Sequence, residues 1–326
     1  MPFPSRRQAA WPLALAIAAC TGAPVEPERA GAPTATFQER QCLARGWQRE
    51  LVHSAGLDRR VLWKGPPGAW TRGALIVLHG GGGSYTNFCV ANVALTEPQV
   101  RFTDAALAAG LAVFLLDSSD RVTDRAGRLC GKVWDDELRE RANLDLPFIG
   151  DVLSALIPAR RPAGSRGEIF LAGHSSGGYM SARAATHFPE RVSAFALVAS
   201  GDPYGWYRDC TRRATDRPNV FGAGFDSETR RVIVEPQACR AAAYPNEQPW
   251  DGRAAASRPP FRVFHHENDA INDVSCAEKI DAQLRAHGYP GAAPLRLTGG
   301  SRALAWHFWL DGYNAPLIEY FSSFTR

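Results

Sequence analysis

The sequence predicts an α/β protein with a mostly parallel central sheet and helices on both faces. Short apolar runs alternate with segments of helical spacing, a pattern typical of parallel strands buried under helices. Two of these runs end in glycine-rich turns, and one of the turns leads straight into a helical segment. The chain has 326 residues, and its length fits one domain with a large insertion better than two equal domains.

The apolar runs predict six strands, at residues 74–78, 111–116, 168–172, 194–199, 261–264 and 295–297. Apolar residues at helical spacing predict helices between residues 144 and 156, from 179 to 187, and from 315 to 324. Pro189 closes the second of these helices. The formal net charge of +4 gives no electrostatic reason to expect nucleic-acid binding.

One serine lies at the tip of the turn between strand 168–172 and the helix that follows. The turn reads Gly-His-Ser-Ser-Gly-Gly over residues 173–178, with Ser175 in its centre. Glycines two residues before and two residues after Ser175 leave room where the strand and helix backbones come close. A strained turn of this kind holds the serine hydroxyl clear of the sheet, where it can attack a carbonyl. We therefore predict that Ser175 is a nucleophile.

A second glycine-rich turn, His-Gly-Gly-Gly-Gly-Ser over residues 79–84, follows strand 74–78. Glycines allow backbone N–H groups to approach a bound oxygen closely. We expect the N–H of Ser176, together with that of Gly80 or Gly81, to form an oxyanion hole for the charge that develops when Ser175 attacks. The alternative is that both turns are glycine-rich loops without this role.

The acid and the histidine of such a site should follow the serine in chain order. Asp269 lies in a loop just after strand 261–264, where a sheet of this kind presents its catalytic carboxylate. Asp273 and Glu267 are the alternative acids. Two histidines come later, and His287 precedes a glycine and a proline, which is typical of a helix C-terminus. His307 is therefore the predicted histidine.

These three residues would work as a triad. A serine hydroxyl is hardly ionised at neutral pH, so His307 would take the proton of Ser175 during attack and return it to the leaving alcohol. Asp269 would hold the imidazole in the required tautomer and stabilise its protonated form.

The motifs together resemble the polyhydroxybutyrate depolymerase and feruloyl esterase group of α/β-hydrolases. The resemblance covers roughly residues 60–324, and it is carried by the two glycine-rich turns, His265-x-x-x-Asp269 and His307-x-Trp309. It implies an α/β-hydrolase fold with a cap-like insertion, and hydrolysis of feruloyl, acetyl or short polyester substrates. The chain differs from that group at three positions, His266, Trp306 and Leu310, where glycine, glycine and proline are usual.

Residues 201–260 interrupt the alternation of strands and helices, and they contain many aromatic side chains. Insertions after this strand commonly cover the active site, so we expect a cap or one wall of the substrate cleft here. The candidate cleft residues are Trp134, Trp206, Tyr207, Trp306 and Trp309. The alternatives are that the aromatics of the insertion anchor a long loop and that the other tryptophans are buried.

The N-terminus predicts export. Two arginines precede an apolar stretch, residues 11–19, that is too short to span a bilayer and has the length of a secretory signal. The sequence Ile-Ala-Ala-Cys at residues 17–20 resembles a bacterial lipobox, in which Cys20 becomes lipid-modified. Residues 1–20 would then be the signal peptide, 21–40 a flexible tether, and 41–326 the hydrolase domain. We expect a membrane-anchored lipoprotein in the periplasm or at the cell surface; the alternative is a cleaved signal and secretion.

Six further cysteines follow Cys20, and an even number in an exported chain suggests disulfides. We expect Cys210 to pair with Cys239, because both lie in the insertion, and Cys89 to pair with Cys130. The alternative is that these cysteines are reduced and buried.

Three function classes remain. The first is a serine esterase, the second a serine peptidase of the prolyl oligopeptidase type, and the third a lipoprotein that keeps the fold but binds rather than cleaves. The chain contains no H-E-x-x-H or C-x-x-C pattern, and no glycine-rich nucleotide motif follows a strand, so we expect neither a metal nor another cofactor. The oligomeric state is left open.

Overall fold

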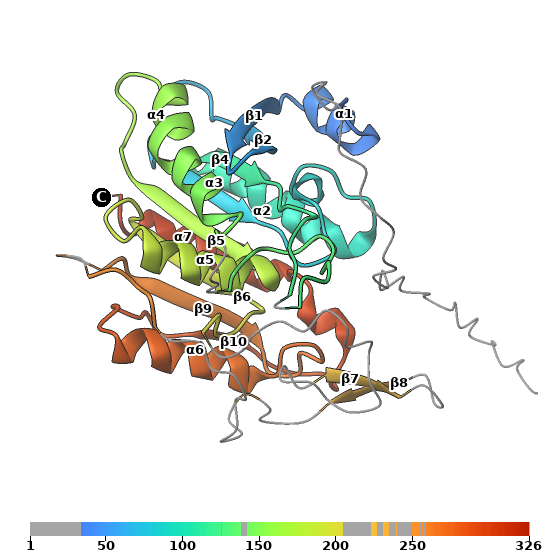
Figure 1. Ribbon diagram of the computed structural model, residues 1–326. Helices are drawn as coiled ribbons and strands as arrows, with labels where there is room; N and C mark the ends of the chain where they lie inside the picture. The colour runs from blue at the N-terminus through green and yellow to red at the C-terminus, as the bar shows by residue number, and fades with distance from the viewer. Residues whose placement is uncertain are drawn as a thin grey trace, which may run out of the picture.

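The computed structural model describes residues 34–124, 126–137, 142–204, 223–226, 231–234, 239, 250–254, 256 and 258–325. An eight-stranded sheet has the order β1-β2-β4-β3-β5-β6-β9-β10 and carries helices on both faces (Figure 1). The strands are β1 (Gln48–Ser54), β2 (Leu57–Lys64), β3 (Ala74–Leu78), β4 (Ala112–Leu116), β5 (Ile169–His174), β6 (Ala194–Val198), β9 (Phe261–His266) and β10 (Leu295–Leu297). The predicted α/β fold is confirmed, and each of the six predicted strands is present.

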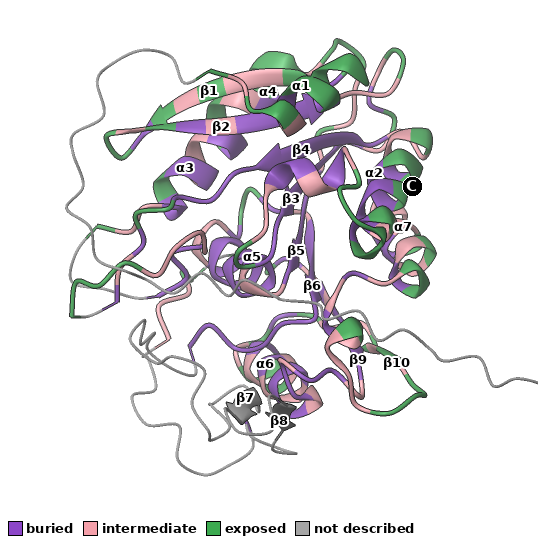
Figure 2. Ribbon diagram, turned by 90° about the vertical axis from the view of Figure 1, so that its right-hand side faces the viewer, coloured by how far each residue is buried: buried purple, intermediate pink, exposed green. Residues whose placement is uncertain are grey.

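Strands β3 to β10 of this sheet run parallel, while β1 and β2 form an antiparallel hairpin that joins β4. Parallel strands bring their C-terminal ends to one edge of the sheet, and the loops after β3, β5 and β9 therefore meet there. The sequence did not indicate the hairpin, because β1 is mostly exposed or half-buried and contains no apolar run (Figure 2).

The described helices are α1 (Phe37–Ala44), α2 (Glu97–Ala108), α3 (Leu146–Asp151), α4 (Ile157–Arg160), α5 (Ser176–His187), α6 (Val274–Ala286) and α7 (Asn314–Ser322). A π-helical stretch, Val152–Leu156, continues α3, so the predicted helix at residues 144–156 is present in altered form. The predicted helices at 179–187 and 315–324 correspond to α5 and α7. None of the helices in the described ranges has the length and apolar character needed to span a bilayer.

Alternate side chains of the strands enter two separate cores, one on each face of the sheet. In β3, Ile76 and Leu78 pack with α3, α5 and α6, while Leu75 and Val77 pack with α2 and α7. Every residue of β3, β4, β5 and β6 is buried (Figure 2). The strands that carry the glycine-rich turns are thus the most enclosed part of the sheet, which gives those turns a rigid base.

Helix α1 begins at Phe37, so it overlaps the last four residues of the predicted tether, 21–40. Thr36 and Glu39 form a capping box, in which the Thr36 hydroxyl accepts from the Glu39 N–H and the Glu39 carboxylate accepts from the Thr36 N–H. The same carboxylate accepts the hydroxyl proton of Tyr85. These bonds fix α1 against the loop after β3 before the first strand begins.

The disulfides differ from the predicted pairs. Cys42 of α1 is bonded to Cys89, and Cys239 is bonded to Cys276 of α6. The predictions Cys89–Cys130 and Cys210–Cys239 are therefore wrong, although Cys130 is disulfide-bonded as well. The first pairing fails because α1 packs on the loop after β3, and the second because residue 239 lies against the start of α6, where its N–H donates to Ser275.

The insertion, residues 201–260, contains a separate hairpin of β7 (Ala223–Asp226) and β8 (Arg231–Val234). Both ends of the insertion are attached to α5 by the fully buried Arg183. The Arg183 guanidinium lies 4.2 Å from the ring centre of Tyr204 and donates to Asp251 at 2.6 Å. Its Nε–H donates to the carbonyl of Asp136, so one side chain joins α5, the loop after β4 and both ends of the insertion.

Candidate active site

Ser175 occupies a sharp turn between β5 and α5, with φ 50° and ψ −119°. This left-handed backbone is uncommon for a residue other than glycine, and it persists because the surroundings fix it. A Cβ atom at Gly177 would lie 2.3 Å from the carbonyl oxygen of Leu78, and one at Gly173 would lie 2.0 Å from that of Gly177. Glycine is therefore required at both positions for the strand and helix to approach each other.

The structure brings Ser175, His307 and Asp269 together, as the sequence predicted. His307 Nε2 lies 3.0 Å from the Ser175 hydroxyl, and His307 Nδ1 lies 2.9 Å from the nearer carboxylate oxygen of Asp269. Asp269 follows β9 and is fully buried, while His307 ends a short 3₁₀ helix, Leu304–His307. With Nδ1–H donating to the carboxylate, the Nε2 lone pair faces the serine hydroxyl.

The surroundings of Asp269 favour its charged form. Burial alone raises the pKa of this carboxyl, but His307 and His265 beside it and the N–H of Ile271 outweigh burial, so its pKa lies below the ordinary value. The Ile271 N–H donates to Asp269 at 2.7 Å and the Asn272 N–H at 3.0 Å. An ionised acid held by two backbone donors is well placed to fix the tautomer of His307.

The alternative acids are engaged elsewhere. Asp273 caps α6, because its carboxylate accepts from the Ser275 N–H, and it also pairs with Arg302 at 2.6 Å. Glu267 accepts from the N–H of Gly299. His287 ends α6 and stacks on Trp250 with ring centres 3.8 Å apart, which confirms its predicted place at a helix C-terminus. Asp273, Glu267 and His287 therefore take no part in the hydrogen bonds that connect Ser175, His307 and Asp269.

The glycine-rich turn after β3 lies against the serine turn. A Cβ atom at Gly80 would lie 3.5 Å from that of Ser175, and one at Gly81 would lie 3.6 Å from that of Ser176. Within the described residues, the N–H groups of Gly80, Gly81 and Ser176 donate to no acceptor. These backbone N–H groups are the donors that the sequence predicts for an oxyanion hole beside Ser175.

Sequence reasoning missed a role for His174, the residue just before Ser175. Its ring is buried, and its Nε2 lies 2.7 Å from the backbone carbonyl of His307. Burial and the neighbouring His307 lower the pKa of His174 to about 4, so its ring is neutral and donates Nε2–H to that carbonyl. A histidine inside the serine motif is the signal that could have pointed to this contact.

His265 holds the acid loop from the other side. Its Nε2–H donates to the carbonyl of Asn272 at 2.9 Å and lies 3.7 Å from the carboxylate of Asp269. Burial lowers the pKa of His265, which keeps the ring neutral. The histidine of the His265-x-x-x-Asp269 motif thus supports the loop that carries the acid.

Two of the predicted cleft residues are corrected. Trp134 and Trp309 have 0% and 1% of their surface exposed, so neither can line an open cleft. Trp309 packs against Phe88 and Phe102 in the core on the α2 face of the sheet, and its indole N–H donates to Asn314. Burial in the core, the alternative reading, holds for both tryptophans.

Trp306 is half-buried and stacks on His266, with ring centres 4.3 Å apart and planes within 3°. Trp206 and Tyr207 lie outside the described residues.

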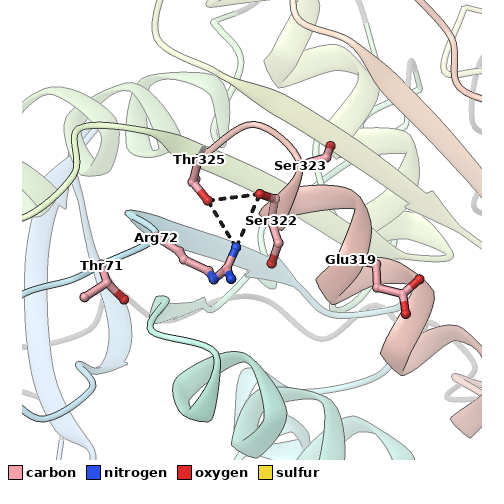
Figure 3. A pocket seen from close by; sticks show the side chains of 6 residues that line it. All are labelled: Thr71, Arg72, Glu319, Ser322, Ser323 and Thr325. Carbon is pink, nitrogen blue, oxygen red and sulfur yellow. Dashed lines mark hydrogen bonds between the residues drawn. The ribbon is translucent and has the colours of Figure 1, made fainter.

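A hollow of about 450 Å³ lies on another part of the surface (Figure 3). Arg72, just before β3, and the last turn of α7 line it, and Arg72 donates to the carbonyl of Ser322 and to the hydroxyl of Thr325. This hollow opens at the N-terminal end of β3, whereas Ser175 lies at the C-terminal ends of the strands. It is therefore separate from the candidate active site.

Comparison with known protein families gives one match for most of the chain. The model of the Alpha/beta hydrolase family matches residues 75–318. This range includes both glycine-rich turns, Asp269 and His307. No curated protein sequence matches the chain.

Solved structures with the same fold include three hydrolases. The acetyl xylan esterase from Aspergillus awamori is 14% identical, with a TM-score of 0.53 over 84% of this chain and 99% of its own. The fluorophosphonate-binding serine hydrolase FphF of Staphylococcus aureus, solved with substrate bound, is 12% identical, with a TM-score of 0.51 over 86% and 98%. The S-formylglutathione hydrolase of Staphylococcus aureus has the same identity, TM-score and coverage. At these identities the likeness concerns the fold.

Proposed function

The chain belongs to the alpha/beta hydrolase family, and on this basis we propose that it is a serine esterase that hydrolyses carboxylic esters. One observation carries the proposal: a single imidazole, His307, bridges the Ser175 hydroxyl at 3.0 Å and the Asp269 carboxylate at 2.9 Å. Nucleophile, base and orienting acid within hydrogen-bond reach are the arrangement that activates a serine. The strained turn at Ser175 supports the same role.

In the first half of the reaction, the Ser175 oxygen attacks the ester carbonyl carbon and its proton passes to His307 Nε2. Asp269 stabilises the imidazolium. The carbonyl electron pair moves to the oxygen, which the N–H of Ser176 and those of the Gly80 turn would bind. When the intermediate collapses, the bond to the alcohol breaks and His307 gives its proton to the leaving oxygen, which leaves an acyl group on Ser175.

The second half repeats these steps with water. His307 takes a proton from a water molecule, whose oxygen attacks the acyl carbon. The second tetrahedral intermediate then releases the carboxylic acid, and the proton on His307 returns to Ser175. Because its pKa lies below the ordinary value, Asp269 is ionised and can stabilise the imidazolium in both halves of the reaction.

Feruloyl, acetyl or short polyester groups are the substrates that we propose for this site. The resemblance of its motifs to the polyhydroxybutyrate depolymerase and feruloyl esterase group supports this choice. The insertion at residues 201–260, whose ends Arg183 attaches to α5, would supply one wall of the cleft.

The nucleophile is tested with a fluorophosphonate probe. Wild-type protein should be labelled and Ser175→Ala should not, because the probe reacts only with an activated serine. Ser154→Ala is a matched control, since Ser154 is an exposed helical serine that donates to the carbonyl of Gly150. Equal labelling of wild type and Ser175→Ala would contradict the assignment.

The reaction is tested with p-nitrophenyl esters from acetate to octanoate and with methyl ferulate. Hydrolysis that is lost in Ser175→Ala supports the esterase, and the preferred chain length describes the cleft. Labelling by the probe without ester hydrolysis would favour the prolyl oligopeptidase type of peptidase. A folded protein that shows neither would favour a lipoprotein that only binds.

We also propose that the protein is exported and anchored to a membrane by lipid on Cys20. The lipobox pattern at residues 17–20 supports this, and so do the disulfides Cys42–Cys89 and Cys239–Cys276, which are typical of oxidising compartments. Several acyl chains on one residue give stable anchoring. Cys20→Ser should move the protein from the membrane fraction to the soluble fraction, and unchanged fractionation would rule the lipobox out.

A further inference from the structure

The loop after β4 clamps the glycine-rich turn. The carbonyl of Lys132 accepts from the N–H of Gly82 at 2.8 Å, and a Cβ atom at Gly81 would lie 3.3 Å from Val133 Cγ1. Lys132 also pairs with Asp117, just after β4, at 2.7 Å. Residues 132–134 therefore lie directly against the turn that carries the expected oxyanion donors.

Trp134 makes two bonds from this loop, in different directions. Its backbone N–H donates to the hydroxyl of Ser176 at 3.1 Å, and its indole N–H donates to the carbonyl of His79 at 2.8 Å. The first bond holds the start of α5, and the second holds the start of the glycine-rich turn. One fully buried residue thus connects the two segments between which an oxyanion would lie.

The bond to the His79 carbonyl has a consequence for Gly80. The carbonyl of His79 and the N–H of Gly80 belong to one planar trans peptide, so they point in opposite directions. By holding that carbonyl, the Trp134 indole fixes the direction of the Gly80 N–H. In the absence of this bond, glycine-rich backbone can rotate easily, because glycine has more accessible conformations than any other residue.

The next peptide is fixed in the same way by the ring of His79. The N–H of Ser118 donates to His79 Nε2 at 3.1 Å, which leaves the proton on Nδ1, and Nδ1–H donates to the carbonyl of Gly80 at 2.8 Å. The Gly81 N–H lies in that peptide and points the other way. The ring of His79 also packs on Trp134, with centres 5.3 Å apart.

We propose that Trp134 is a positioning residue of the oxyanion hole: it holds the Gly80 N–H and the Ser176 end of α5 in one rigid frame. Trp134 is buried and does not touch substrate, so it acts through the backbone donors. The inference rests on the proposed serine hydrolase function. Preorganised donors stabilise the transition state because they need no reorientation when charge develops, so Trp134 should affect kcat rather than KM.

The test is Trp134→Phe, which keeps a buried ring and removes the indole N–H. Trp63→Phe is the matched control, since Trp63 is also buried and its indole N–H donates to Glu50 on the β1–β2 hairpin. We expect Trp134→Phe to lower kcat on an activated ester by about 10- to 100-fold with KM nearly unchanged. The control should keep the wild-type kcat.

A second readout isolates the oxyanion. An aryl trifluoromethyl ketone adds the Ser175 oxygen to its carbonyl carbon, the serine proton goes to His307, and the charged oxygen enters the hole. The inhibition constant of the ketone should rise in Trp134→Phe by the same factor by which kcat falls. The acid limb of the pH profile of kcat should stay at its wild-type position. A shifted acid limb would overturn the proposal, because the effect would then pass through the triad.

Ser176→Ala provides a milder variant in case Trp134→Phe does not fold. It removes the acceptor of the Trp134 backbone N–H and keeps the Ser176 N–H. We expect it to lower kcat and to raise the inhibition constant of the ketone in parallel. If the folded variants keep the wild-type kcat and the wild-type inhibition constant, the inference about Trp134 is overturned, while the proposed function still stands. A wild-type protein that reacts with neither the ketone nor a fluorophosphonate would instead overturn the proposed function.

Discussion

His174 should make the protein unstable in acid. Its ring is buried, and it donates Nε2–H to the backbone carbonyl of His307. Burial is the main cause that lowers its pKa, the nearby His307 and His79 add to it, and Asp269 opposes them. The folded protein therefore binds a proton at His174 much less readily than the unfolded chain does.

The magnitude follows from linkage. The pKa of His174 is about 4 in the folded protein, against an ordinary value of 6.5. Because the folded pKa is the lower one, the stability from a neutral His174 is complete above pH 6.5 and is lost as the pH falls toward 4. Between pH 8 and pH 5 this one group should remove about 2 kcal/mol from the free energy of unfolding.

Urea unfolding of wild type and His174→Gln at pH 8 and pH 5 measures this loss. Glutamine keeps an N–H donor and takes up no proton, so the variant should lose about 2 kcal/mol less than wild type between the two pH values. His53→Gln is the control, since His53 is exposed in the β1–β2 hairpin, and it should follow wild type. Equal losses in wild type and His174→Gln would refute the reasoning.

Three further predictions concern the turn, the acid and a disulfide. Gly177→Ala places a methyl group 2.3 Å from the carbonyl of Leu78, so it should lower the free energy of unfolding by about 1–3 kcal/mol or more; a wild-type urea midpoint would contradict this. Asp269→Asn should lower kcat about 10⁴-fold in steady-state assays, because the amide favours the wrong histidine tautomer, and a retained kcat would point to another acid. Replacing Cys42 and Cys89 with alanine opens a link between positions 47 residues apart and should cost about 4 kcal/mol in urea unfolding; an unchanged midpoint would show that the link constrains little.

The parts of the fold that the sequence predicts are those with local signals. Strands β3 to β6 appear as apolar runs because both of their faces are buried, and the serine turn appears because its glycines are sterically required at Gly173 and Gly177. The β1–β2 hairpin has no such signal. Its first strand is mostly polar, the apolar run of its second strand is only three residues long, and its turn uses Ala55 and Gly56 with positive φ in place of the Asn-Gly pair that marks such turns.

The site residues divide in the same way. Ser175, Asp269 and His307 follow from motif and chain order, which the sequence contains. The burial of Trp134 and the pairing of Cys42 with Cys89 depend on which loops meet in space, and nothing local determines that. The sequence allows Trp134 to line a cleft or to be buried, and its lack of exposure and its hydrogen bonds to Ser176 and to the carbonyl of His79 place it in the interior.

Arg183 joins the start of the insertion, its end and the loop after β4 to one helix. It attaches both ends of the insertion to the helix that begins after Ser175, and between those ends Cys239 is bonded to Cys276 of α6, so the insertion is tied to the same scaffold that carries the triad. If the insertion lines the cleft of the proposed esterase, exchange of the chain between these attachments with that of related hydrolases would alter which esters are accepted without rebuilding the triad. Substrate range would then be open to modular change, with the Arg183 guanidinium and the Cys239–Cys276 disulfide as fixed joints.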